Sequence, residues 1–156
     1  MKKLLIILGM VFLAIILLVA VVVDVAAVRG SALDKEGRAY ADRNLPLIIS
    51  TWDEQELLSR ASPEFLQNTK KEDLDRDFAG LSRKFGKMQS YEGSEGQSYV
   101  DYRILSSHNG KIVTAVYSAR VIFAGGPAVV KLSLIQHDGR WQIAGFNINS
   151  DMLIQH

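Results

Sequence analysis

Two tyrosines and a tryptophan supply the polar groups that this sequence places among alternating apolar residues. Tyr102, Tyr117 and Trp141 each occupy an apolar position in a stretch where every second residue is apolar. In a β-strand such residues point to one face of the sheet. Their hydroxyl and indole groups donate hydrogen bonds, so we expect these three residues to contact a ligand if that face lines a pocket. The alternative interpretation is that they pack in the core and find partners within the fold.

The same face carries no candidate acid or base. Asp101, Arg103, Arg120 and Lys131 fall at the alternate positions of the predicted strands, so they point to the opposite face. General acid-base catalysis needs a proton donor and a proton acceptor within reach of one substrate atom. We therefore predict no catalytic residues.

The histidines and the main acidic cluster do not have the spacing of a metal site. His108 and His137 lie beside predicted turns, and His156 has no partner at a ligand spacing. The four acids between Glu72 and Asp77 are interleaved with basic residues, which is typical of a solvated helix face. They lack the glycine and the later glutamate of a calcium loop. The chain contains no cysteine and no glycine-rich phosphate loop, so we predict neither a metal ion nor a cofactor.

Length and charge narrow the classes of protein that need to be considered. The chain has 156 residues, 18 of them basic and 17 acidic, which is enough for one domain and one appended element. No run of basic residues is longer than two. The sequence therefore lacks the positive surface of a nucleic-acid-binding protein.

The appended element is a predicted transmembrane helix. Lys2 and Lys3 precede a run of apolar residues and glycine from Leu4 to Val23, which as a helix spans about 30 Å, the thickness of a bilayer core. The two lysines place the amino terminus in the cytoplasm. We expect residues 1–28 to form a single-pass anchor in the inner or plasma membrane, with residues 29–156 in the periplasm or outside the cell. The alternative is a cleaved signal peptide, for which the small residues at 25–27 offer a site.

The residues after the anchor predict helices first. Apolar residues recur with helical spacing from Leu33 to Trp52, and Pro46 is expected to kink or split that helix. Short helices are expected at 53–60 and, after the Ser62 cap, at 63–67. Thr69 opens an apparent capping box, which predicts a helix that continues to Phe85 and ends at Gly86.

Beyond Gly86 the apolar period changes from helical to alternating, which predicts the strands of an antiparallel meander. Glycine-containing breaks are expected at 93–96, 108–110, 125–127 and 138–139. In the last strand, apolar residues change parity across Ala144 and Gly145, so we expect a β-bulge there. The sequence thus predicts an α+β fold in which helices cover one face of a curved antiparallel sheet.

These elements together resemble the NTF2-like (cystatin-like) superfamily, and in particular its small bacterial envelope domains of unknown function. The resemblance covers about residues 31–150. It rests on the first amphipathic helix, the capped helix that ends in Phe85-Gly86-Lys87, and the closing residues Asp138–Ile143 with Gly145-Phe146. The resemblance implies a cone in which the sheet and helices enclose a pocket. It also implies a function among isomerases, dehydratases, ligand carriers and non-enzymatic assembly modules.

The function we expect is a membrane-anchored, non-catalytic binding or assembly module of the cell envelope. Its partners would be the membrane, an envelope protein complex or a second copy of the chain, and a small apolar ligand. A homodimer would use the outer sheet face, where Ile112, Val116 and Ile122 lie beside Arg120.

Two alternatives remain open. One is an isomerase-like or dehydratase-like enzyme that pairs Tyr102 or Tyr117 with a helix carboxylate such as Asp42. The other is a cleaved, secreted ligand carrier of the same fold.

Overall fold

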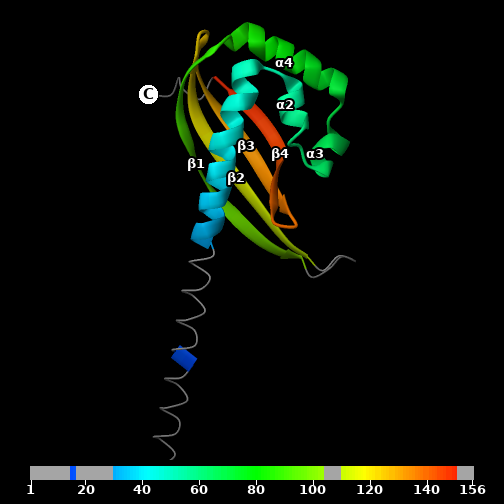
Figure 1. The fold of residues 1–156 in the computed structure, drawn as a ribbon, viewed down its shortest axis with the longest axis vertical. Helices are drawn as coiled ribbons and strands as arrows, with labels where there is room; N and C mark the ends of the chain where they lie inside the picture. Colours follow the sequence, from blue (N-terminus) through cyan, green and yellow to red (C-terminus); the bar gives the residue numbers. More distant parts are fainter. Residues whose placement is uncertain (1–14, 17–29, 104–109, 151–156) are drawn as a thin grey trace, which may run out of the picture. The chain divides into compact units, whose positions relative to one another are not determined.

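The structure is a computed structural model that describes residues 15–16, 30–103 and 110–150, except for the side chains of 101–103 and 110–111 (Figure 1). The chain divides into two units, Met1–Leu33 and Asp34–His156. Apart from helical Ile15 and Ile16, the predicted anchor lies outside the described residues. Across the residues that are described, no helix has the length and apolarity needed to cross a bilayer. The anchor therefore stays a prediction.

The helical part consists of one long helix and three shorter ones. They are the helix of residues 30–51, α2 (Glu54–Leu58), α3 (Pro63–Asn68) and α4 (Lys71–Phe85). The Asp53 carboxylate caps α2 through the Gln55 N–H, and the Ser62 hydroxyl caps α3 ahead of its first-turn proline. The two short helices that the sequence predicts are confirmed.

The structure corrects two details of the helix predictions, namely the split at Pro46 and the capping box at Thr69, whereas the kink expected as the alternative at Pro46 stays a prediction. Residues 30–51 are helical without interruption, so Pro46 does not split the helix. Proline removes only one backbone hydrogen bond, and Leu45, Ile48 and Ile49 on either side are fully buried, so packing holds both halves together. The predicted capping box at Thr69 does not form either, because Lys70 is the N-cap of α4 and provides no side-chain hydrogen bond.

Four strands form the predicted antiparallel meander in the order β1-β2-β3-β4. They are β1 (Met88–Arg103), β2 (Gly110–Phe123), β3 (Gly126–His137) and β4 (Arg140–Asn149). The glycine break expected at 93–96 is wrong, because β1 runs through it with an irregularity between Tyr91 and Ser94. Gly93 has φ of 87°, which a glycine adopts at low cost within a bulge.

The bulge predicted in the last strand is confirmed. Ser133 pairs with Gly145 and Leu134 pairs with Ile143, which leaves Ala144 as the additional residue. Beyond the bulge, Phe146 lies opposite Leu132 on the face that carries Ile143. The bulge therefore keeps the apolar residues of β4 on the core side despite their change of parity in the sequence.

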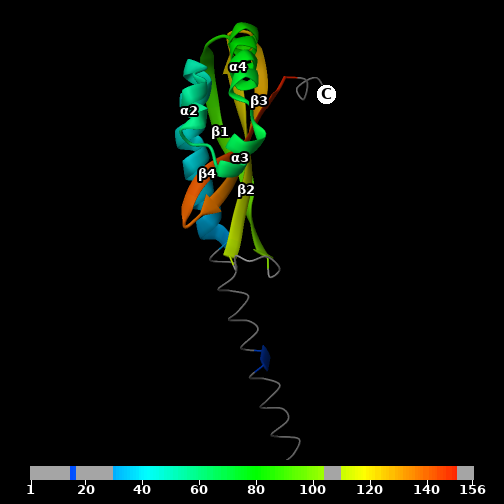
Figure 2. The ribbon, with the colours of Figure 1, turned by 90° about the vertical axis from the view of Figure 1, so that its right-hand side faces the viewer.

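The core lies between the helices and one face of the sheet. The predicted apolar positions of β2 and β3 are buried there against residues of the 30–51 helix and α4. From the sheet the core receives Val113, Ala115, Tyr117, Ala119, Val121, Phe123, Ala128, Val130, Leu132, Leu134 and Ile143, each at most 1% exposed. Figures 1 and 2 show the helices of residues 30–103 gathered over this side of the sheet, and none of them covers the opposite face, which we call the uncovered face.

The outer edge of β4 is paired with the segment between α2 and α3. Ser62 donates its backbone N–H to the Ile143 carbonyl oxygen at 2.8 Å, and Ile143 donates to the Arg60 carbonyl oxygen at 2.8 Å. Ala61 forms a parallel bridge with Ile143. At this point the segment satisfies backbone groups that an edge strand otherwise exposes.

Gly37 allows the long helix to approach the sheet closely. A Cβ atom at this position would lie 2.5 Å from Tyr117 Oη and 3.0 Å from Tyr117 Cε2. Tyr117 is fully buried, so its ring cannot move aside without disturbing its neighbours.

We expect Gly37→Ala to lower the free energy of unfolding by about 1–3 kcal/mol, because the added methyl group overpacks the core. Gly80 is the matched control, since it is also helical and a Cβ atom there would meet nothing within 4 Å. Gly80→Ala should raise the stability by up to about 1 kcal/mol through helix propensity alone. Urea unfolding of both variants measures the difference, and equal effects would contradict the close approach.

Candidate functional site

Tyr117 lies in the core with its hydroxyl satisfied by the protein. Its Oη donates to the Asp34 carbonyl oxygen at 3.1 Å and lies 3.2 Å from Ser98 Oγ. Burial raises the pKa of Tyr117 above its ordinary value. The Tyr117 side chain, which we expected to face a pocket, therefore packs against the long helix.

The structure does not bring Tyr117 and Trp141 side by side. In the sheet register Tyr117 is aligned with Leu132 and Phe146, whereas Trp141 pairs with Gln136 at the beginning of β4. Trp141 is partly buried at the margin of the core, and its Nε1 is shielded from solvent without a hydrogen-bond partner. Tyr102 pairs with Lys111 through the backbone, and its side chain falls outside the described part.

Two aspartates of the long helix bind the outer edge of β1, and sequence reasoning missed this contact. Asp42 Oδ1 accepts hydrogen bonds from Tyr91 Oη at 2.6 Å and from the Ser94 N–H at 2.8 Å. Asp34 Oδ1 accepts one from the Ser98 N–H at 2.6 Å. We call this pair of carboxylates the aspartate clamp.

The spacing of the clamp follows from element geometry. Asp34 and Asp42 are eight residues apart, about 12 Å along a helix. Ser94 and Ser98 are four residues apart, about 13 Å along a strand. The long helix therefore runs alongside β1, and each carboxylate meets a backbone N–H that points away from β2. The sequence signal was two aspartates on one helix face beside the apolar stripe.

The clamp also uses the carboxylate that the enzyme alternative requires. Asp42 contacts Tyr91 and Ser94, whereas the Tyr117 hydroxyl contacts Asp34 and Ser98. Burial, followed by the hydrogen bond to Asp42, raises the pKa of Tyr91 far above its ordinary value. Asp42 thus acts as an acceptor within the fold.

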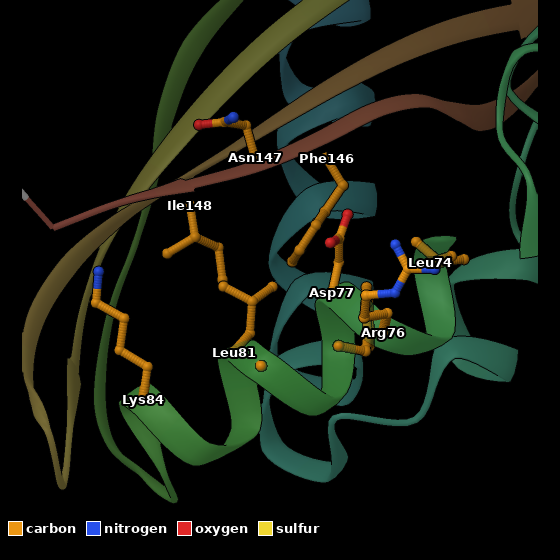
Figure 3. Close-up of a pocket in the computed structure, with 10 residues that line it drawn as sticks. Leu74, Arg76, Asp77, Leu81, Lys84, Phe146, Asn147 and Ile148 are labelled. Atoms are coloured by element: carbon orange, nitrogen blue, oxygen red, sulfur yellow. The ribbon is translucent and has the colours of Figure 1, made fainter. Parts of the chain in front are cut away.

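A groove lies between α4 and β4 (Figure 3). It has a volume of about 390 Å³. Its apolar lining includes Phe78, Leu81 and Phe146, and Arg76 and Lys84 also line it. The groove has room for a small apolar group. Asp77 is the only carboxylate among the described residues that line it.

The uncovered face of the sheet carries two further hollows that share Ser118 and Val129. One has a volume of about 630 Å³ and extends across β3 to β4, where Lys131 and Asn147 line it. The other, of about 310 Å³, extends toward β1 and Glu95. Together they form a trough of small and charged side chains across the sheet.

The ionisable groups of the helices pair with one another at the surface. Lys71 lies 3.4 Å from Asp75, and Arg76 lies 3.4 Å from Asp73. His137 Nε2 lies 2.9 Å from Glu64 Oε1, while His108 and His156 fall outside the described residues. Within the part of the chain that the structure describes, no three metal-ligating side chains gather in one place.

No protein-family model, curated protein or solved structure matches this chain.

We expect Asp42→Asn to lower the free energy of unfolding by about 1–3 kcal/mol, because a charged acceptor of two hydrogen bonds becomes a neutral amide. Arg43→Gln, at the exposed neighbouring position, is the control and should change stability by less than about 0.5 kcal/mol. Chemical denaturation of both proteins provides the measurement. A stability of Asp42→Asn equal to that of the control would remove the clamp as a stabilising contact.

The raised pKa values of Tyr91 and Tyr117 predict a loss of stability in alkaline solution. The unfolded chain ionises its tyrosines near pH 10 and the folded protein does so only at higher pH. The stabilisation is complete below about pH 10 and is lost as the pH rises further. Urea unfolding between pH 8 and pH 11 should show this decline, with a smaller decline for Tyr91→Phe. An identical decline in that variant would contradict the assignment of Tyr91.

Proposed function

We propose that this chain is a membrane-anchored, non-catalytic binding and assembly module of a cell envelope. In this proposal the amino terminus is cytoplasmic and the folded unit lies on the other side of the membrane. The observation that carries the proposal is that the polar groups on the core side of the sheet bind other parts of the fold. Asp34, Asp42 and the Tyr117 hydroxyl hold the long helix to β1 and β2.

The separate partners of Asp42 and Tyr117 support a binding role over the enzyme alternative. Proton transfer needs an accessible acceptor close to a donor. Asp42 and Tyr117 have separate partners, and Tyr117 is fully buried. The remaining exposed features are the α4/β4 groove and the uncovered sheet face, and both are suited to binding another molecule.

The anchor part of the proposal rests on the sequence. The run from Leu4 to Val23 is long enough to span a bilayer, and Lys2 and Lys3 precede it. The likeness to small NTF2-like envelope domains is also proposed from the sequence. The α4/β4 groove favours a small apolar ligand as a second candidate partner, held over Phe78 and Phe146.

Membrane fractionation tests the proposal. We expect the full chain, produced in bacterial cells, to stay in the membrane pellet after an alkaline carbonate wash. Its intact mass should include Lys2 and Lys3, and protease added to spheroplasts should digest the folded unit. A variant without residues 1–28 is the control and should appear in the soluble fraction. A mature chain that begins near Val28 would contradict the anchor and favour the secreted carrier.

A further inference from the structure

The uncovered sheet face carries charges of opposite sign on different strands. Glu92 and Glu95 lie on β1, whereas Arg120 lies on β2 and Lys131 on β3. All four side chains are exposed. None has an ion pair within the described part of the chain, although several charges on the helices do. The face is thus acidic along one edge and basic at its centre.

The sheet register places these charges in rows. Glu95 pairs with Ser118, and Ser118 pairs with Lys131, so the three residues form one row across three strands. In the next row Arg120 pairs with Val129 and lies opposite the bulge that contains Glu92. Within one molecule the row separates Glu95 from Lys131 by two strand spacings, about 10 Å.

We propose that two copies of this chain pack face to face through the uncovered sheet face, with a two-fold axis along β2. This arrangement places β1 of each copy over β3 of the other. Glu95 then faces Lys131 of the second copy, twice by symmetry, and Ser118 faces Ser118. Arg120 lies beside the axis. Measured across the strands, it is one strand spacing, about 5 Å, from β1 of the second copy, which carries Glu92.

Apolar residues and small side chains of the same face complete the fit. Val116 and Ile122 would each meet their own counterparts on the axis, which places β-branched side chains together at the centre. The hollow that Glu95 and Ser118 line on the β1 side, about 310 Å³ in volume, has room for the aliphatic stem of Lys131 from the second copy.

The direction of the axis follows from the proposed anchor, on which this inference rests. The aspartate clamp aligns the long helix with β1, so residue 34 lies toward the Ser98 end of the sheet. Two copies anchored in one membrane need their amino-terminal ends on the same side. An axis along the strands satisfies this condition, whereas an axis across the strands places the two ends on opposite sides.

Cysteine crosslinking tests the arrangement on a clean background, because the chain has no cysteine of its own. The full chain carrying Ser118→Cys is treated in native membranes with a short bis-maleimide crosslinker of about 8 Å reach and resolved on a denaturing gel. We expect most of it to run as a dimer, because cysteines that face each other across the axis, on sheets packed about 10 Å apart, lie within the reach of this crosslinker but are too far apart for a disulfide. Ser50→Cys, exposed on the long helix, is the matched control and should stay mostly monomeric.

Charge exchange provides the second measurement. In the Ser118→Cys background, Glu95→Lys or Lys131→Glu alone should slow crosslinking by about tenfold, because each places like charges opposite one another. The double exchange should restore most of the rate. Thermal unfolding of each variant verifies that it folds.

The outcomes separate this inference from the proposed function. Crosslinking of Ser118→Cys no greater than that of Ser50→Cys, in a chain that stays in the membrane, would overturn the dimer and leave the anchor. Equal rates in the single and double charge variants would overturn the facing of Glu95 and Lys131. Crosslinked dimers of a chain that is absent from the membrane would overturn the anchor and the argument for the axis.

Discussion

The hydrogen bonds between helix carboxylates and the outer edge of β1 decide how the long helix sits on the sheet. A backbone N–H that is shielded from water needs an acceptor, and here Asp34 and Asp42 provide one for Ser98 and Ser94. The match between two helical turns and four strand residues fixes the direction of the helix. Gly37 then allows the helix to contact the Tyr117 ring directly.

This close approach has a consequence for function. When a helix lies directly on a sheet, the space between them is taken by side chains at the density of a protein interior. The Tyr117 ring fills the space between the long helix and the sheet, and its hydroxyl is bound to the backbone of the helix. In the part of the chain that the structure describes, hollows that remain at the surface include the α4/β4 groove and those on the far side of the sheet.

Local patterns in the sequence predicted those parts of the fold that depend on local rules. Alternation identified the core face of β2 and β3, and the change of parity at Ala144 identified the bulge. The same rules failed where a distant contact decides the outcome. Gly93 appeared to end a strand, but pairing with β2 carries β1 through it. The aspartate clamp joins residues 52 and 64 positions apart, so the two aspartates on one helix face did not show which strand they bind. The expected ligand contacts of Tyr102, Tyr117 and Trp141 were derived from the alternation of side chains along the strands alone. Alternation identifies the face of the sheet to which a side chain points, but not whether a helix covers that face.

Both outer edges of the sheet are covered in part, which limits how copies of this protein can join. Arg60 to Ser62 pair with the border of β4, and the two aspartates occupy donors along that of β1. Growth by strand addition, which generates open-ended fibrils, is blocked along these stretches. Association is left to flat faces, where symmetry closes an assembly at a fixed number of subunits.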